Sequence, residues 1–347
     1  MLMPYPLKQN MLTDVNNEIK KSLREIKNEV VHSKIRELVN KHSGEEIENT
    51  SGANAMIFKN QSSPHEKESH NSLVRFFNDA LFGKTEERKN ISWYTQYQLN
   101  HAIENGQSER VVMPGEAGRL TGYYHKGTPL DEDRNKINKV VLFLHGSGSP
   151  VEEQSIAVYR KYQEHGIDVL AVNMRGYGKS ESYPSEKGFY QDARTMFHYL
   201  VNEKGITPDN IIIHGYSMGA AIAADLTRYA EQNSMVVSGL LLDRPMPSMS
   251  KTIIAHKVVN PAGLVGALSK SVNGLFSVEK NVKGLTNKVP IMLLTDSEGL
   301  GVEGEKLRSK LVASGYNVRG EATAFTHEQS DRLMEQYTGS IVSIFSG

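Results

Sequence analysis

Hydrophobic residues recur with two different periodicities along the 347-residue chain. In residues 11–42 they recur every three or four positions, which predicts an amphipathic helix packed on a neighbour. Residues 43–70 are polar and rich in Ser, Asn, Glu and Gly, which indicates a linker. Helical patterns return at residues 72–82 and 92–103. We therefore expect a helical N-terminal region over residues 1–109.

From about residue 110 the periodicity changes, and short apolar runs alternate with helical segments. Such alternation is typical of a mostly parallel sheet with helices on both faces. We expect residues 110–347 to form one domain of this kind. The predicted strands are 119–125, 139–145, 168–174, 210–215, 239–243, 289–296 and 316–322, and the predicted helices include 151–165, 189–203 and 304–314.

One predicted strand leads directly into a serine flanked by glycines. Residues 211–226 read IIIHGYSMGAAIAADL, so Ser217 occupies the centre of a G-x-S-x-G motif. At a sharp strand-to-helix turn the flanking positions must be tiny, because neighbouring backbone passes close by. The small residues that follow let the helix approach the sheet, and its N-terminus directs N–H groups at the serine. This context predicts that Ser217 is a nucleophile.

A nucleophilic serine needs a base and an orienting acid, which follow it in the chain in this kind of site. Two histidines follow Ser217. His327 comes after the last predicted strand and is the predicted base, whereas His256 lies inside a long segment between strands. For the acid we favour Asp296 at the end of strand 289–296. The alternatives are Glu298 and Asp243, and they stay open on the sequence alone.

The oxyanion of an acyl transfer needs two backbone N–H donors. The predicted donors belong to Met218, directly after the nucleophile, and to Ser147 in the loop LFLHGSGSP, with Gly148 as the alternative. In the same loop His145 is expected to have a structural role. His214, on the nucleophile strand, is expected to be a hydrogen-bonded core residue.

Composition narrows the function further. The chain has 40 basic and 40 acidic side chains, and a neutral total argues against bulk nucleic-acid binding. It has no cysteine, which excludes disulfides, thiol catalysis and cysteine zinc sites. The N-terminus shows no Sec signal, and no window approaches the roughly 18 apolar residues of a transmembrane helix. The predicted reaction needs no metal or organic cofactor.

Residues 110–347 resemble proteins of the α/β-hydrolase fold. The resemblance is carried, in chain order, by the motifs HGSG, RGYGKS and GYSMG, a late Asp296 and a final His327. Longer stretches are similar to the α/β-hydrolase effector domain of the multifunctional autoprocessing repeats-in-toxin (MARTX) toxins of bacteria such as Vibrio. Those stretches are HGYSMGAAIAADL, GLLLDRPMPSMSK, NPAGLVGALSKSVNGLFSVEKN and LLTDSEGLGVEGEKLRSKL.

The toxin resemblance implies a specific activity. It implies a phospholipase A1 that acts on phosphatidylinositol 3-phosphate in host cells and disturbs endosomal traffic and autophagy. The protein would then be a secreted effector that acts in the host cytosol at endosomal membranes. The triad carried over by resemblance is Ser217, Asp296 and His327.

A long insertion at residues 244–288 fits an anionic lipid. It contains seven basic side chains and one acidic side chain, which leaves a local charge of +6 in a neutral chain. With its many aliphatic residues it predicts a basic, apolar cap over the serine. We expect Lys251, Lys257 and Lys270 to bind substrate, although a solvated basic surface would give the same pattern.

Two other functions are compatible with the residues. One is a different serine hydrolase, such as a general carboxylesterase, a lysophospholipase or a thioesterase. The other is a binding module that keeps the fold without catalysis, against which the intact Ser217, Asp296 and His327 argue.

Overall fold

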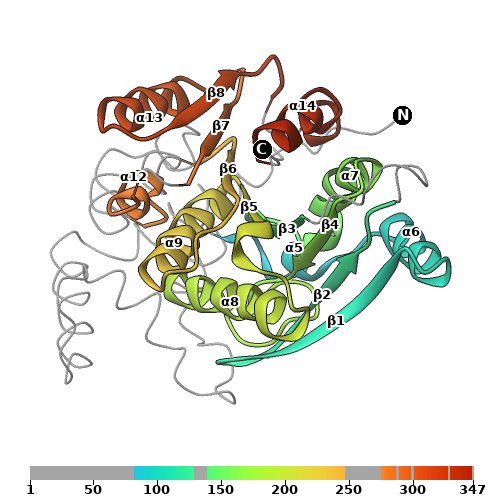
Figure 1. Ribbon diagram of the computed structural model, residues 1–347. Helices are drawn as coiled ribbons and strands as arrows, with labels where there is room; N and C mark the ends of the chain where they lie inside the picture. The colour runs from blue at the N-terminus through green and yellow to red at the C-terminus, as the bar shows by residue number, and fades with distance from the viewer. Residues whose placement is uncertain are drawn as a thin grey trace, which may run out of the picture.

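The computed structural model describes residues 82–128, 139–246, 275–286, 289–297, 301–326 and 329–345. Within these ranges the chain forms an eight-stranded sheet in the order β1-β2-β4-β3-β5-β6-β7-β8 (Figure 1). The strands are β1 (Ser108–Gly115), β2 (Gly118–His125), β3 (Val140–Leu144), β4 (Asp168–Val172), β5 (Ile211–Tyr216), β6 (Gly239–Asp243), β7 (Ile291–Thr295) and β8 (Val318–Ala322).

The sheet has an antiparallel edge and a parallel centre. β1 pairs antiparallel with β2, and β2 pairs antiparallel with β4. Every pair from β4 through β3, β5, β6 and β7 to β8 is parallel. The carboxyl ends of these six strands therefore meet at one edge of the sheet, which is where ligands bind in open α/β folds.

Helices cover both faces of the sheet. On one face lie α8 (Glu186–His198), α9 (Met218–Gln232), α12 (Val278–Val282) and α13 (Gly301–Ala313). On the other lie α6 (Trp93–Glu104), α7 (Val151–Glu164) and α14 (Ser330–Phe345). The short helix α5 (Thr85–Lys89), a π-helical turn η2 (Tyr199–Glu203) and a 3-10 turn η3 (Pro208–Asn210) complete the described elements.

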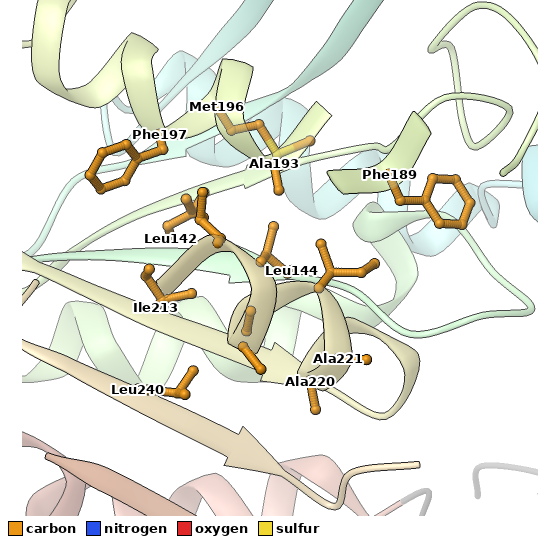
Figure 2. Packing of buried hydrophobic residues seen from close by; sticks show 14 of the residues in the cluster. Leu142, Leu144, Phe189, Ala193, Met196, Phe197, Ile213, Ala220, Ala221 and Leu240 are labelled. Carbon is orange, nitrogen blue, oxygen red and sulfur yellow. The ribbon is translucent and has the colours of Figure 1, made fainter. Parts of the chain in front are cut away.

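Alternate residues of the central strands point to opposite faces and build two cores. Leu142, Ile213 and Leu240 face α8 and α9, and Figure 2 shows them opposite Phe197 and Ala220. The intervening residues of the same strands pack against α7 and α14. Because both faces are buried, the strands are continuous apolar runs, as the sequence pattern predicted.

All seven predicted strands are confirmed within a few residues, and so is the helix predicted at residues 92–103. The predictions missed β1, whose sequence SERVVMPG mixes charged residues and a proline with alternating apolar ones. β1 is stabilised by pairing with β2 along its whole length, an interaction that the local sequence pattern does not show. The predicted helix at 189–203 begins at Glu186 and ends at His198, where η2 follows.

Several predictions lie outside the described residues, among them the amphipathic helix at 11–42, the linker at 43–70 and most of the helix at 72–82. The predicted division after residue 109 falls inside β1 (Ser108–Gly115), and α6 packs against the same sheet, so the described residues before 110 belong with the sheet. None of the helices in the described ranges is both long and apolar enough to cross a membrane.

Candidate active site

Ser217 lies at the turn between β5 and α9, in a backbone conformation that few residues adopt. Its φ is 53° and its ψ is −113°, which costs on the order of 1–3 kcal/mol for a residue other than glycine. The turn is held from two sides, because the Ser217 N–H donates to the Asp243 carbonyl and the Ser217 carbonyl accepts from Met246 N–H. Strain of this kind marks a functional position when the surrounding structure maintains it.

The glycines around Ser217 are required by their neighbours. A Cβ at residue 219 would overlap the backbone oxygen of Leu144 at the end of β3. A Cβ at residue 215 would lie 2.6 Å from the Cα of Ala220. The strand, the elbow and the first turn of α9 are therefore in backbone contact, and the G-x-S-x-G spacing reflects this crowding.

The predicted oxyanion donors lie on either side of this crowded point. Met218 is fully buried at the first position of α9, and the loop from His145 to Pro150 follows β3, whose end touches Gly219. Gly148 N–H donates to the Phe82 carbonyl at 3.2 Å. That bond favours Ser147 over Gly148 as the second donor.

Gln154, on the first turn of α7, braces the same loop. Its Oε1 accepts from Gly146 N–H at 2.7 Å, and its Nε2 donates to the carbonyls of Gly146 and Ser149 at 3.2 and 2.7 Å. The role of Gln154 was not predicted from the sequence. A lone glutamine in an amphipathic helix carries no signal that distinguishes it from a solvated one.

His145 is structural, as expected from the sequence. Its ring is fully buried, and its Nε2 accepts from Met174 N–H at 3.1 Å, so the proton is assigned to Nδ1, which donates to Gly146 O at 2.8 Å. Burial lowers the pKa of His145 to about 4 against the hydrogen bond to Gly146. A neutral imidazole therefore connects the β3 loop to the loop after β4.

Asp296 directly follows β7 and is 6% exposed. The segment after β8 runs beside it, because Thr323 N–H and Oγ1 donate to the Thr295 carbonyl at 3.1 and 2.8 Å. Ser297 N–H donates to the Phe325 carbonyl at 2.9 Å. The structure thus brings the predicted acid beside the segment that leads to His327, which itself lies outside the described residues.

Asp243, the alternative acid, is already occupied. It is fully buried at the end of β6, and Arg244 Nε donates to its Oδ1 at 2.7 Å while His214 Nε2 donates to Oδ2 at 3.2 Å. Burial acts to raise the pKa of Asp243, but the Arg244 charge and the His214 bond outweigh it and hold the pKa well below its usual range. These partners favour Asp296 as the acid.

His214 is a hydrogen-bonded core residue, as predicted. It is fully buried, and its Nδ1 accepts from the Tyr162 hydroxyl at 3.2 Å. The other two alternatives from the sequence, Glu298 and His256, lie outside the described residues.

Arg244 is one of the seven basic side chains counted in the insertion at residues 244–288, and its interpretation as a cation of the cap is wrong. Its side chain is fully buried and ion-paired with Asp243, so it adds no charge to the protein surface. Lys280 and Lys283 are exposed near the end of the insertion, where the half-buried Glu279 pairs with Lys310 at 2.9 Å. The predicted substrate-binding residues Lys251, Lys257 and Lys270 lie outside the described residues and stay predictions.

The arrangement can carry out nucleophilic chemistry at a carbonyl. A strained serine faces a helix N-terminus, a glycine loop lies beside it, and a strand-end carboxylate lies two strands away. Within the described ranges no group of three or more His, Asp or Glu side chains could hold a metal ion. Sheet order and elbow together define the α/β-hydrolase class.

Comparisons with known proteins agree with this class. Residues 135–294 match the model of the serine aminopeptidase S33 family. The chain is similar to a crystal structure of an alpha-beta hydrolase from Vibrio vulnificus, with 62% identity, a TM-score of 0.75, and coverage of 82% of this chain and 97% of that one. The chain belongs to the α/β-hydrolase family.

Two relatives add context. The multifunctional-autoprocessing repeats-in-toxin of Vibrio vulnificus is 62% identical over 292 residues, which is 84% of this chain and 6% of the toxin. The chain thus spans a small part of that relative's length. The lysophosphatidylserine lipase ABHD12 of Danio rerio is 28% identical over 118 residues, covering 34% of this chain and 30% of that protein.

Proposed function

We propose that this protein is a serine hydrolase that cleaves an acyl ester of an anionic phospholipid. The observation that carries the proposal is the strained Ser217 at the carboxyl edge of the sheet, held against the N-terminus of α9. The Ser217 side chain precedes α9 without capping it. A strand-to-helix elbow of this kind presents its serine oxygen at the carboxyl edge of the sheet, where a substrate carbonyl can reach it.

The proposed mechanism assigns one role to each predicted residue. His327 takes the proton of Ser217 as its oxygen attacks the ester carbonyl, and Asp296 orients the imidazole and stabilises its charged form. The N–H groups of Met218 and Ser147 stabilise the oxyanion. His327 then protonates the leaving alcohol, and water hydrolyses the acyl-enzyme.

An exposed aromatic row supports a substrate in a membrane. Trp93, Tyr94 and Tyr97 on α6 are 79%, 59% and 56% exposed, and the Trp93 and Tyr97 rings stack at 5.9 Å. Tryptophan and tyrosine prefer the membrane–water interface. The first turn of α6 contacts the first turn of α7, which follows the predicted oxyanion loop, because Thr95 Oγ1 donates to Glu153 at 3.0 Å.

The resemblance to the toxin domains and the name of the lysophosphatidylserine lipase relative support a lipid substrate. On the toxin resemblance we extend the proposal to a phospholipase A1 acting on phosphatidylinositol 3-phosphate. The protein would act in the host cytosol at endosomal membranes after secretion.

The test is a product analysis by mass spectrometry on vesicles that contain phosphatidylinositol 3-phosphate, comparing wild type with Ser217→Ala. We expect a lysolipid and a free fatty acid from wild type alone. Equal turnover of neutral short-chain esters and phosphoinositides would instead indicate a general carboxylesterase. A fluorophosphonate probe that fails to label the wild type would indicate a binding module.

Membrane contact has a separate readout, because Trp93 is the single tryptophan of the chain. We expect its fluorescence emission to shift to the blue when anionic vesicles are added. Tyr97→Ser should weaken vesicle binding while leaving turnover of a soluble ester unchanged. An emission spectrum that vesicles do not alter would argue against contact through α6.

A further inference from the structure

Arg244 is a cation with no surface role. It follows β6, its side chain is fully buried, and its φ of 44° places it in the left-handed region that non-glycine residues rarely adopt. Its N–H donates to the Leu294 carbonyl at 2.8 Å, which fixes its backbone against β7. Burying a guanidinium is costly unless it is paired and hydrogen-bonded, so its contacts account for its position.

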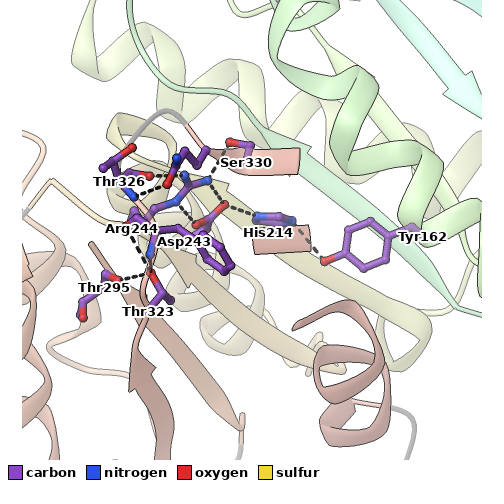
Figure 3. Close-up of polar contacts among 10 residues, drawn as sticks. Tyr162, His214, Asp243, Arg244, Thr295, Thr323, Thr326 and Ser330 are labelled. Atoms are coloured by element: carbon purple, nitrogen blue, oxygen red, sulfur yellow. Dashed lines mark hydrogen bonds and ion pairs between the residues drawn. The ribbon is translucent and has the colours of Figure 1, made fainter. Parts of the chain in front are cut away.

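One side of the guanidinium faces a buried polar chain (Figure 3). Its Nε and one terminal nitrogen donate to the two oxygens of Asp243 at 2.7 and 3.2 Å. Asp243 accepts in turn from His214, which accepts from Tyr162. Asp243 is therefore the counter-ion that keeps the Arg244 charge in the interior.

The other side of the guanidinium reaches the segment that carries the predicted base. One terminal nitrogen donates to the Thr326 carbonyl at 3.2 Å, and the other donates to Ser330 Oγ at 2.7 Å (Figure 3). Thr326 comes one residue before His327 and Ser330 three residues after it. Both ends of this short stretch are thus bonded to one rigid group.

The same guanidinium also contacts the nucleophile side. Its carbon lies 4.8 Å from the centre of the Tyr216 ring, and Tyr216 directly precedes Ser217. Burial acts to lower the pKa of Arg244, but Asp243 outweighs it, with smaller contributions from Tyr216 and Asp296, so the pKa is raised. Arg244 therefore lies among the three segments that carry the predicted triad.

We infer that Arg244 is a positioning residue for the catalytic base, an inference that rests on the proposed function. A general base works only within hydrogen-bond reach of the proton that it takes, and small misplacements cost up to about 100-fold in rate. The planar guanidinium presents several donors in a fixed geometry, so it can bond Asp243, Thr326 and Ser330 at once. A lysine cannot reproduce this set.

A purely structural role is the competing explanation. A buried ion pair often contributes little net stability compared with apolar residues of similar size. The described chain offers a matched comparison in Arg175 and Asp192, a second buried pair joined at 2.7 Å. That pair connects the loop after β4 to α8.

The experiment removes each pair as a unit, so that no buried charge is left unpaired. The test variant is Asp243→Asn with Arg244→Met, and the control is Asp192→Asn with Arg175→Met. We measure kcat and KM on a soluble p-nitrophenyl ester, the rate of fluorophosphonate labelling at Ser217, and the melting temperature.

We expect the test variant to lose about 10- to 100-fold in kcat and in labelling rate, with KM within twofold of wild type. The control variant should keep the wild-type kcat even if its melting temperature falls as far as that of the test variant. The inference would be overturned if the test variant had the same kcat as the control variant when the two have equal melting temperatures.

Two milder variants cover the case in which the double variant does not fold. Ser330→Ala removes one of the bonds and should lower kcat by about 3- to 10-fold, whereas the exposed Ser340→Ala on the same helix should not. In Arg244→Ala, guanidinium below denaturing concentration should restore part of the labelling rate beside the intact Asp243, and ammonium should not. Wild-type kcat in Ser330→Ala together with no guanidinium rescue would count against Arg244.

The inference and the proposed function fail in different ways. If wild type is labelled at Ser217 and His327→Ala is not, the serine hydrolase stands, and a fully active test variant refutes the role of Arg244 alone. If wild type is not labelled, both fail.

Discussion

The two sides of the site are built by different kinds of interaction. The nucleophile side depends on neighbours in the chain, with Gly215, Ser217 and Gly219 packed into one turn against the end of β3. The acid–base side depends on residues far apart in sequence. There Asp296 lies beside the segment ending at Thr326, and Arg244 bonds that segment from 82 positions away.

The difference shows what fixes the geometry on each side of the site. Steric crowding at an elbow is encoded locally, because only tiny side chains fit where two backbones touch. The segment that leads to the predicted base follows β8, which pairs only with β7 among the described strands, and a hydrogen bond from Arg244 holds that segment at Thr326. Substitutions on the two sides should therefore fail in different ways.

The largest expected effect separates the two carboxylates. Asp296→Asn should lower kcat/KM by about 10³- to 10⁴-fold, because the imidazole loses its orienting acid, while the free energy of unfolding changes by less than about 1 kcal/mol. Asp243→Asn should cost about 3–5 kcal/mol of stability, because it leaves the buried Arg244 without its counter-ion. Ester hydrolysis and urea unfolding measure the two quantities. If Asp296→Asn kept wild-type turnover, Asp243 or Glu298 would become the acid.

The next effect tests the crowding at the elbow. Gly219→Ala should destabilise the protein by more than about 3 kcal/mol, because its Cβ would overlap the backbone of β3 and the surrounding core cannot yield. Gly205→Ala is the control, since its surroundings are open and only its φ of 67° carries a cost, about 1–2 kcal/mol. Urea unfolding compares the two. Equal losses would mean that the contact with β3 is not tight.

A third effect concerns pH and the nucleophile side. His145 has a pKa of about 4 in the folded protein and about 6.5 when unfolded. Its contribution to stability is complete above pH 6.5 and is lost as the pH falls toward 4, because only the unfolded state binds the proton there. At pH 5 the loss is about 2 kcal/mol.

Urea unfolding at pH 7 and pH 5 measures this loss as a difference between wild type and His145→Gln. The exposed His101→Gln on α6 should leave the pH dependence unchanged. An identical pH dependence in wild type and His145→Gln would show that His145 is not held neutral.

The smallest effect concerns the brace of the oxyanion loop. Gln154→Met should lower kcat by about tenfold with little change in KM, because Gly146 and Ser149 lose the bonds that hold the loop in place. Gln163→Met is the matched control on the same helix, where the side chain donates to the Lys126 carbonyl. Steady-state kinetics on a soluble ester compares them, and equal kcat values would make Gln154 an ordinary loop contact.

The site residues that could be predicted from the sequence are those whose chemistry has a local signature. The elbow of Ser217, the strand-end Asp296 and the glycine loop with His145 each follow a buried strand, so their places in the sheet could be predicted. Arg244 was assigned to the cap because a cation in a basic segment looks like a surface residue. Its neighbours in the sequence do not indicate that its side chain is buried and bonds both Asp243 and Ser330 on α14.

By itself the sequence determined the fold class, because strand and helix periodicities and the small residues of the elbow are local consequences of steric fit. It also predicted which side chains would serve as a serine nucleophile, a base and an acid. Only the tertiary structure decided that Asp243 is engaged by Arg244 and His214 and that Gln154 braces the oxyanion loop. Those roles depend on burial and on bonds between distant segments, and both exist only once the chain has folded.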